Sequence, residues 1–180
     1  TGIGWPRVVS SGEDHNTIHI ICITGTSYQG LYQALLYYRS LDGGETWDIQ
    51  HQIIEGTSAD NYLIFWSDTY TWAEPKGDTL CFVAGWSWYD QFIMKSFDNG
   101  TTWTKTVIWP CPFNKWEGGD STGTFWAPDG CSAIALDKNG MAHVTFGLMR
   151  ANGDESGNRY WFPFTDGLVY WNEDMPQLPV

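Results

Sequence analysis

Short apolar runs separated by turn-forming residues recur along this chain. Three of them, HIICITG, LCFVAG and AHVTFG, end on Gly25, Gly85 and Gly147. Runs of this length, rich in β-branched and aromatic residues and bounded by Gly, Asn and Asp, are typical of β-strands. The three glycines are spaced by 60 and 62 residues. This spacing predicts a structural unit of about 60 residues that occurs three times.

Each unit also contains strand candidates on both sides of its apolar run. A strand-like segment precedes each run (WPRVVSS, DTYTWAEP and CSAIALD), and a turn-rich segment separates the two (SGEDHN, PKGD and DKNG). After a long loop come LLYYRSLDGGETWDI, FIMKSFDNGTTWTKTVI and the shorter DGLVYWNED. Each unit therefore predicts a four-stranded antiparallel meander. QGLYQALLYYRS has some helical spacing, but its second half continues into a predicted strand. The sequence thus predicts an all-β protein of three units, approximately 1–56, 57–110 and 111–180.

One octapeptide pattern, S-x-D-x-G-x-T-W, occurs twice within these units. Its defining residues are Ser40, Asp42, Gly44 and Trp47 in the first copy, and Ser96, Asp98, Gly100 and Trp103 in the second. A glycine can take the positive φ of a tight turn, and an aspartate can accept hydrogen bonds from backbone N–H groups of its own turn. The tryptophan would pack beneath the hairpin. We therefore predict a structural role for both copies, not acid–base chemistry.

The two octapeptides resemble the Asp boxes, or bacterial neuraminidase repeats, of the sialidase-like β-propeller superfamily. In the third unit DGLVYWNED stands at the corresponding place, so its box has degenerated. The resemblance implies three four-stranded blades of a propeller that has six blades in sialidases. It further implies a secreted or cell-surface protein whose remaining blades come from a longer chain, from further copies or from a partner chain. The boxes would lie away from the ligand-binding face.

Aromatic residues of the predicted loops are the candidates for ligand binding. The segment GWSWYDQ, read as a loop, crowds several rings into a short connection, and strand alternation would point Trp86 and Trp88 the same way. Exposed rings beside carboxylates suit sugars, because the ring stacks on C–H groups while the carboxylate accepts hydroxyl protons. The predicted ligand-binding residues are Trp86, Trp88, Tyr89, Asp90 and Trp116.

Catalysis is the alternative that the resemblance raises. Sialidases use an arginine triad, a tyrosine nucleophile paired with a glutamate, and an aspartate acid/base. Arg7, Arg150 and Arg159 are the candidate triad, since each falls near the predicted loop face. WPRVV departs from the family pattern, because its proline precedes Arg7. The leading hypothesis is a non-catalytic, glycan-binding recognition or scaffold module; an exo-sialidase-like half-site and a structural component of an extracellular assembly are the alternatives.

Composition and residue spacing argue against several classes of binding partner. The net charge of −12, with only 9 Lys and Arg, argues against nucleic acid and anionic membrane surfaces as partners. No apolar run is long enough for a membrane helix. The four histidines and four cysteines show no metal-ligand spacing, so we expect no metal or cofactor. We expect Cys22 and Cys81 to be buried thiols, and a disulfide between Cys111 and Cys131 stays open.

Overall fold

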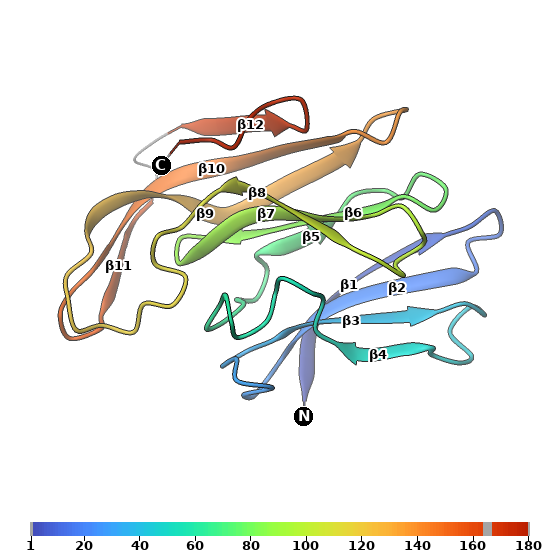
Figure 1. Ribbon diagram of the computed structural model, residues 1–180, viewed down its shortest axis with the longest axis horizontal. Coiled ribbons are helices and arrows are strands. Elements are labelled where there is room, and N and C mark those ends of the chain that lie inside the picture. Colours follow the sequence, from blue (N-terminus) through green and yellow to red (C-terminus); the bar gives the residue numbers. More distant parts are fainter. Residues whose placement is uncertain (1, 164–166, 180) are drawn as a thin grey trace.

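The computed structural model describes residues 2–163 and 167–179, which form strands, turns and loops and no helix. The first sheet is an antiparallel meander in the order β1–β2–β3–β4. Its strands are β1 (Ile3–Ser11), β2 (Thr17–Thr24), β3 (Leu35–Ser40) and β4 (Ile49–Gln52). The sheet thus corresponds to the first predicted unit (Figure 1).

The second sheet repeats this meander in the order β5–β6–β7–β8. Its strands are β5 (Tyr70–Trp72), β6 (Leu80–Trp86), β7 (Tyr89–Ser96) and β8 (Thr104–Trp109). Both octapeptides connect the third strand of a sheet to its fourth, as the sequence predicted.

The third sheet also has four strands, but they are joined differently. They are β9 (Gly123–Leu136), β10 (Ala142–Gly153), β11 (Arg159–Phe162) and β12 (Leu168–Asn172). β9 pairs along one edge of β10, while β11 and β12 pair with successive halves of its other edge. β12 therefore holds the place of a third strand, and β11 belongs to a hairpin that prolongs the sheet. The expected fourth strand after β12 is not among the described strands.

The three sheets are arranged as blades of a β-propeller. Their first strands, β1, β5 and β9, are neighbours and contribute to one pocket. The fourth strands β4 and β8 lie at the outer edges of their sheets. The all-β, three-sheet propeller portion predicted from the sequence is therefore confirmed (Figure 1).

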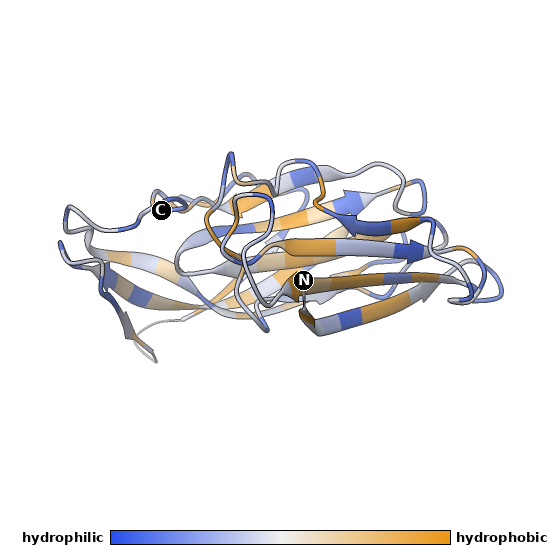
Figure 2. Cartoon of the chain, turned by 90° about the horizontal axis from the view of Figure 1, so that it is seen from below, coloured by the Kyte–Doolittle hydropathy of each residue, from blue (hydrophilic) through white to orange (hydrophobic). Residues whose placement is uncertain are grey.

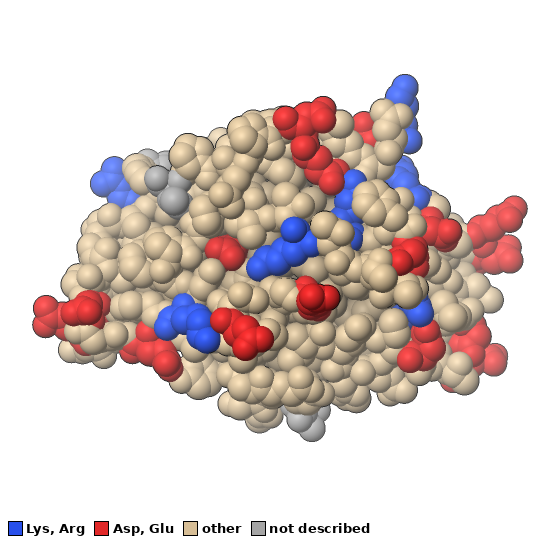
Figure 3. Space-filling view, viewed as in Figure 1, with Lys and Arg blue, Asp and Glu red and all other residues tan. Residues whose placement is uncertain are grey.

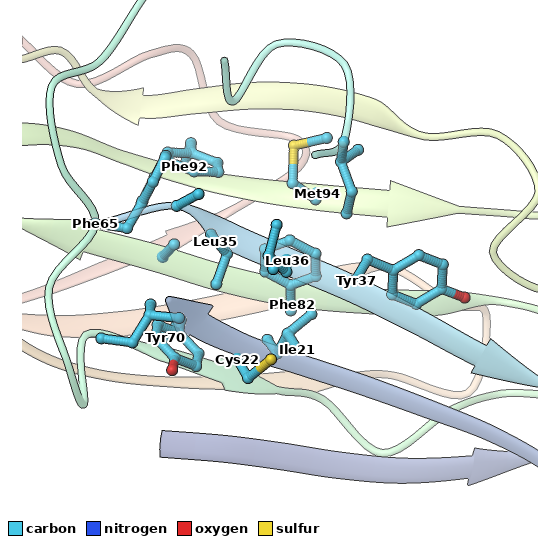
Figure 4. Close-up of a cluster of buried hydrophobic side chains, with 14 of the residues drawn as sticks. Ile21, Cys22, Leu35, Leu36, Tyr37, Phe65, Tyr70, Phe82, Phe92 and Met94 are labelled. Atoms are coloured by element: carbon cyan, nitrogen blue, oxygen red, sulfur yellow. The ribbon is translucent and has the colours of Figure 1, made fainter. Parts of the chain in front are cut away.

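The core lies between the sheets, because each central strand buries side chains on both of its faces. Between the first and second sheets, Ile21, Leu35 and Tyr37 pack with Phe82 and Met94 (Figure 4). A second cluster joins the second and third sheets and includes Cys81, Val83, Ile93, Val144, Phe146 and Trp171. Figure 2 shows the corresponding hydrophobic stretches within the strands and hydrophilic residues at the turns. Burying these apolar side chains stabilises the fold at roughly 25 cal/mol per Å².

The meander gives the molecule two different ends. We call turn end the end that carries both octapeptides and the β1–β2, β5–β6 and β9–β10 hairpins, at the right of Figure 1. We call loop end the opposite end, which carries the connections β2–β3, β4–β5, β6–β7 and β8–β9. An up-and-down meander requires this separation, because alternate connections lie at opposite ends of the strands.

Candidate functional site

The two octapeptides form turns with matching hydrogen bonds. In the second, the Ser96 hydroxyl donates to Asp98 Oδ1 at 2.8 Å and accepts from the Gly100 N–H at 2.9 Å. Asp98 also accepts the backbone N–H and the hydroxyl of Thr102, at 2.8 and 2.6 Å. These bonds lower the pKa of Asp98 to about 2. The carboxylate is thus engaged within its own turn.

The first octapeptide has the same contacts. The Ser40 hydroxyl donates to Asp42 at 2.8 Å and accepts from the Gly44 N–H at 2.8 Å. Asp42 accepts the N–H and hydroxyl of Thr46 at 2.8 and 2.6 Å, and these bonds lower its pKa. Two positive-φ glycines, Gly44 and Gly100, allow the chain to reverse at the same place in each turn.

The second turn also docks on the first sheet. Asn99 Oδ1 lies 2.6 Å from the Ser11 hydroxyl and 3.1 Å from His19 Nε2, while His19 Nδ1 lies 2.7 Å from the Tyr37 hydroxyl. Burial lowers the pKa of His19 to about 4. Arg39 is mostly buried, because it pairs with Asp48 at 2.7 Å and donates to the Asn99 carbonyl at 2.8 Å.

The segment GWSWYDQ is a tight hairpin and not an open loop. Trp86 pairs with Tyr89 across a two-residue turn, so strand alternation does not relate Trp86 to Trp88. Trp88, Tyr89 and Asp90 are 2%, 1% and 8% exposed. The expectation that these three face solvent is wrong, because the turn folds Trp88 under the loop end and β7 is buried between two sheets.

Their contacts explain this burial. Trp88 stacks on Trp116 at 4.9 Å and meets Phe125 edge-on at 5.3 Å. Asp90 accepts the Tyr62 hydroxyl at 2.7 Å and the Cys111 N–H at 2.8 Å. These groups hold the β4–β5 and β8–β9 connections against β7, and of the five predicted residues only Trp86 and Trp116 are partly exposed.

Three tryptophans form a row at the loop end, which we call the tryptophan row. Trp66 stacks on Trp86 with a centroid distance of 5.2 Å, and Trp86 lies 5.8 Å from Trp161. Trp66 and Trp161 are 43% and 41% exposed. The Trp161 indole N–H donates to the Ser87 hydroxyl at 2.8 Å, which fixes that ring. Segments that lie far apart in sequence thus present wide apolar rings side by side.

A pocket of about 580 Å³ opens where the first strands meet, and we call it the axial pocket. Its charged lining residues are Arg7, Asp68 and Asp129, with Arg7 paired to Asp68. The Asp129 carboxylate is seated against Gly147, where a Cβ would meet Oδ2 at 2.1 Å. This site was not predicted in full, because Asp129 precedes the predicted strand CSAIALD in sequence, and only the closeness of β5 and the longer β9 places it in the same pocket as Asp68.

Trp86 of the tryptophan row lies against Gly130, which is next to a lining residue of the axial pocket. Gly130 follows Asp129, and a Cβ placed on it would lie 3.0 Å from Trp86 Cδ1 and 3.3 Å from the Thr69 methyl group. Thr69 in turn follows Asp68. The positive φ of 89° at Gly130 and its lack of a side chain therefore let the ring of Trp86 approach the strand that carries Asp129. The Trp86 ring and the Asp129 carboxylate thus belong to neighbouring parts of the loop end, although none of the three rings lines the pocket itself.

The three candidate arginines do not form a triad. Arg150 lies opposite Phe162, and Arg159 lies opposite Gly153, three residues farther along β10. Because successive residues alternate between the faces of a sheet, Arg150 and Arg159 project to opposite faces. Arg159 lies over Trp88 and Trp116 at 5.1 and 5.3 Å, and burial lowers its pKa. The hypothesis of converging arginines is therefore wrong; Arg7 alone of them lines the axial pocket.

All four cysteines are free. Cys22 and Cys81 are buried, as expected. Cys111, which is buried, and Cys131, which is exposed, are both free thiols, so the disulfide that the sequence left open is not formed. Within residues 2–163 and 167–179, no group of three or more His, Cys, Asp or Glu side chains is placed to hold a metal ion. No described segment forms a helix that could cross a membrane. On the face that is viewed in Figure 1, the basic side chains lie in small groups among acidic and uncharged ones (Figure 3).

Comparison with known proteins gives a limited result. No protein-family model matches the chain, and no curated protein matches it in sequence. Among solved structures, a GH43 protein, BlXynB from Bacillus licheniformis, is similar with 12% identity and a TM-score of 0.42, over 91% of this chain and 30% of that one. The sialidase of Trypanosoma rangeli is similar with 16% identity and a TM-score of 0.42, over 93% and 31%. The catalytic domain of a GH62 α-L-arabinofuranosidase from Coprinopsis cinerea has 14% identity and a TM-score of 0.38, over 93% and 49%.

The chain thus spans between about a third and a half of these structures. At such identities and TM-scores the likeness carries no conclusion about what this chain binds or catalyses. The functional argument depends on the axial pocket and the tryptophan row.

Proposed function

We propose that the axial pocket and the tryptophan row together bind carbohydrate, in a recognition module that need not be catalytic. The observation that supports this most directly is the contact of Trp86 with the strand that carries Asp129. A sugar ring has apolar C–H faces and a rim of hydroxyl groups. It therefore needs flat apolar surface and hydrogen-bonding groups within one ring's width of each other.

The charges of the pocket fit neutral hydroxyls better than an anionic group. Two carboxylates, Asp68 and Asp129, accept hydrogen bonds, and Arg7 is already paired with Asp68. An acidic sugar would have to displace that pair and lie beside Asp129. Neutral hexoses or pentoses are thus the preferred ligand class. The secreted or cell-surface location stays a prediction of the family resemblance.

A screen on an array of neutral and acidic glycans, followed by titration of tryptophan fluorescence with the best ligand, tests the proposal. We expect Trp161→Ala and Asp129→Asn each to weaken binding at least tenfold. Phe97→Ala is the matched control, since Phe97 is an aromatic residue 66% exposed at the turn end. Absence of any glycan ligand, or full binding by both loop-end variants, would exclude this site.

Glycoside hydrolysis is the second candidate, and one observation favours it. Hydrolysis of a glycosidic bond by two carboxylic acids needs both of them in one cleft, and Asp68 and Asp129 line the same pocket. A panel of aryl glycosides would show release of the aryl group by the protein and not by Asp129→Asn. Binding without hydrolysis would leave the recognition role and reject the enzyme.

A further inference from the structure

Neighbouring sheets in this chain meet through equivalent faces. We call receiving face the side of a sheet that points to the next sheet along the chain, and presenting face the side that points to the previous one. The receiving face of the first sheet includes His19, Ile21 and Tyr37. The presenting face of the second sheet includes Trp72, Phe82, Met94 and Trp103. The apolar and aromatic residues of these two faces share one hydrophobic cluster. The ring of His19 lies 6.4 Å from that of Trp72.

The same arrangement recurs between the second and third sheets. Cys81, Val83 and Ile93 form the receiving face of the second sheet, and Ile134, Val144 and Trp171 form the presenting face of the third. Strand register relates the positions: Phe82 pairs with Met94 as Val144 pairs with Trp171. The chain thus contains two examples of one interface.

The receiving face of the third sheet repeats that of the first. His143 pairs with Asn172 and Thr145 with Tyr170, just as His19 pairs with Arg39 and Ile21 with Tyr37. In both sheets the histidine Nδ1 lies 2.7 Å from the tyrosine hydroxyl, and the rings stack at 6.1 Å. Tyr37 is 0% exposed, however, whereas Tyr170 is 52% exposed.

An apolar pocket lies on this third receiving face. It has a volume of about 240 Å³ and is lined by Ala133, Ile134, Ala135, His143, Val144, Thr145 and Tyr170. Ala133 pairs with Thr145 as Arg7 pairs with Ile21. In the first sheet the corresponding place is filled by Trp72, whose indole donates to the Arg7 carbonyl at 3.1 Å. The pocket on the third sheet is therefore equivalent to the position on the first sheet that Trp72 of the second sheet fills.

The presenting face of the first sheet is not covered by another of the described sheets. Register places Val8, Ile20 and Tyr38 where the second sheet has Trp72, Phe82 and Met94. Val8 is 63% exposed. Ile20, Tyr38 and Trp47 border an apolar pocket of about 250 Å³ together with Ile3 and Gln50. Among residues 2–163 and 167–179, one receiving face and one presenting face are thus open, and both are largely apolar.

The first octapeptide turn also suits the His143–Tyr170 pair. In the second turn, Asn99 supplies the carboxamide oxygen that meets His19, and Gly100 lies against the Tyr37 hydroxyl. The first turn has Gly43 in place of Asn99, but Asn16 Oδ1 lies 2.8 Å from the position of a Cβ on Gly43. The carboxamide oxygen of Asn16 thus lies close to the position that the Asn99 side chain holds in the second turn.

We propose that the receiving face of the third sheet binds the presenting face of the first sheet in a second copy of this chain. The contact repeats the interface between the first and second sheets. It joins two different surfaces, so a pair of bound copies still has one open receiving face and one open presenting face, and the assembly is completed when these faces close into a ring.

Sedimentation velocity over a range of protein concentrations tests this proposal. We expect a mass of twice the chain mass or a larger whole multiple. Ala133→Arg on the receiving face and Val8→Arg on the presenting face should each shift the dissociation constant at least a hundredfold, because a charge would be buried against apolar groups. Both residues are exposed within one chain, so circular dichroism should show unchanged folding. Ser156→Arg, an exposed loop-end change with the same added charge, should associate like the unmodified protein.

Mixing the two variants gives the sharper test. Each keeps one functional face, and the two faces are complementary, so an equimolar mixture should form a 1:1 dimer that grows no further. The proposal is overturned if the unmodified chain stays monomeric at hundreds of micromolar, as expected if only a further sheet of a longer polypeptide covers these faces. Association that Ala133→Arg and Val8→Arg leave unchanged would overturn it too, since the contact would then lie elsewhere.

Discussion

The turn end and the loop end of the same strands use polar residues in opposite ways. At the turn end, Asp42 and Asp98 are each engaged by a serine and a threonine of their own turn. At the loop end, Asp68 and Asp129 line an open pocket and the rings of Trp66 and Trp161 remain exposed. Polar groups that are paired internally stabilise the fold, whereas groups left facing solvent can bind a ligand.

The largest expected effect tests the turn end by overpacking. A Cβ on Gly100, where φ is 79°, would meet the Tyr37 hydroxyl at 2.0 Å, whereas a Cβ on Gly44, where φ is 97°, has no atom within 4 Å. Gly100→Ala should lower the free energy of unfolding by about 3 kcal/mol or more, and Gly44→Ala by about 1 kcal/mol from backbone strain alone. Urea denaturation measures both. Equal losses would mean that the second turn is not held against the first sheet.

Acidification should weaken the turn end through His19. Its pKa is about 4 in the folded protein and 6.5 in the unfolded chain, so the unfolded chain binds more protons between these values. Its contribution is complete above pH 6.5 and is lost as the pH falls toward 4, by on the order of 2 kcal/mol. His19→Gln should flatten the dependence of unfolding free energy on pH between 6.5 and 5. An unchanged slope would contradict the buried, neutral imidazole.

Removing one turn carboxylate should have a smaller effect. Asp98→Ala leaves the Thr102 N–H and the Ser96 hydroxyl without their acceptor, which costs about 1–2 kcal/mol. Thermal unfolding followed by circular dichroism measures the loss. Phe97→Ala, one residue away and 66% exposed, is the control and should change stability by less than about 0.5 kcal/mol. If the two variants proved equally stable, the aspartate would not be a structural residue.

The smallest effect on stability is expected at the loop end. Trp161→Ala removes a ring 41% exposed and one hydrogen bond to Ser87. It should therefore change the unfolding free energy by less than about 1 kcal/mol, while carbohydrate binding falls at least tenfold. Parallel denaturation and binding measurements separate the two quantities. A large loss of stability without loss of binding would reverse the roles assigned to the two ends.

The repeat pattern of the sequence was enough to predict the fold and the two octapeptide turns. Turns made by local bonds, such as those of Ser96, Asp98 and Thr102, depend on residues four or fewer positions apart. The period of about 60 residues likewise reflects a unit whose strands pair within it. The third sheet differs from the predicted four-stranded meander, because β11 and β12 share one edge of β10.

The site was decided by contacts between units, which no local pattern encodes. Trp88 and Asp90 looked like exposed loop residues, yet they are buried because the segment forms a two-residue turn and other connections cover it. Asp129 and Asp68 line one pocket only because β5 and β9 are neighbours. The sequence by itself therefore determined the blades and their turns through short-range hydrogen bonds and apolar periodicity. The tertiary structure alone decided which rings and carboxylates face solvent together, because that depends on how separate sheets pack.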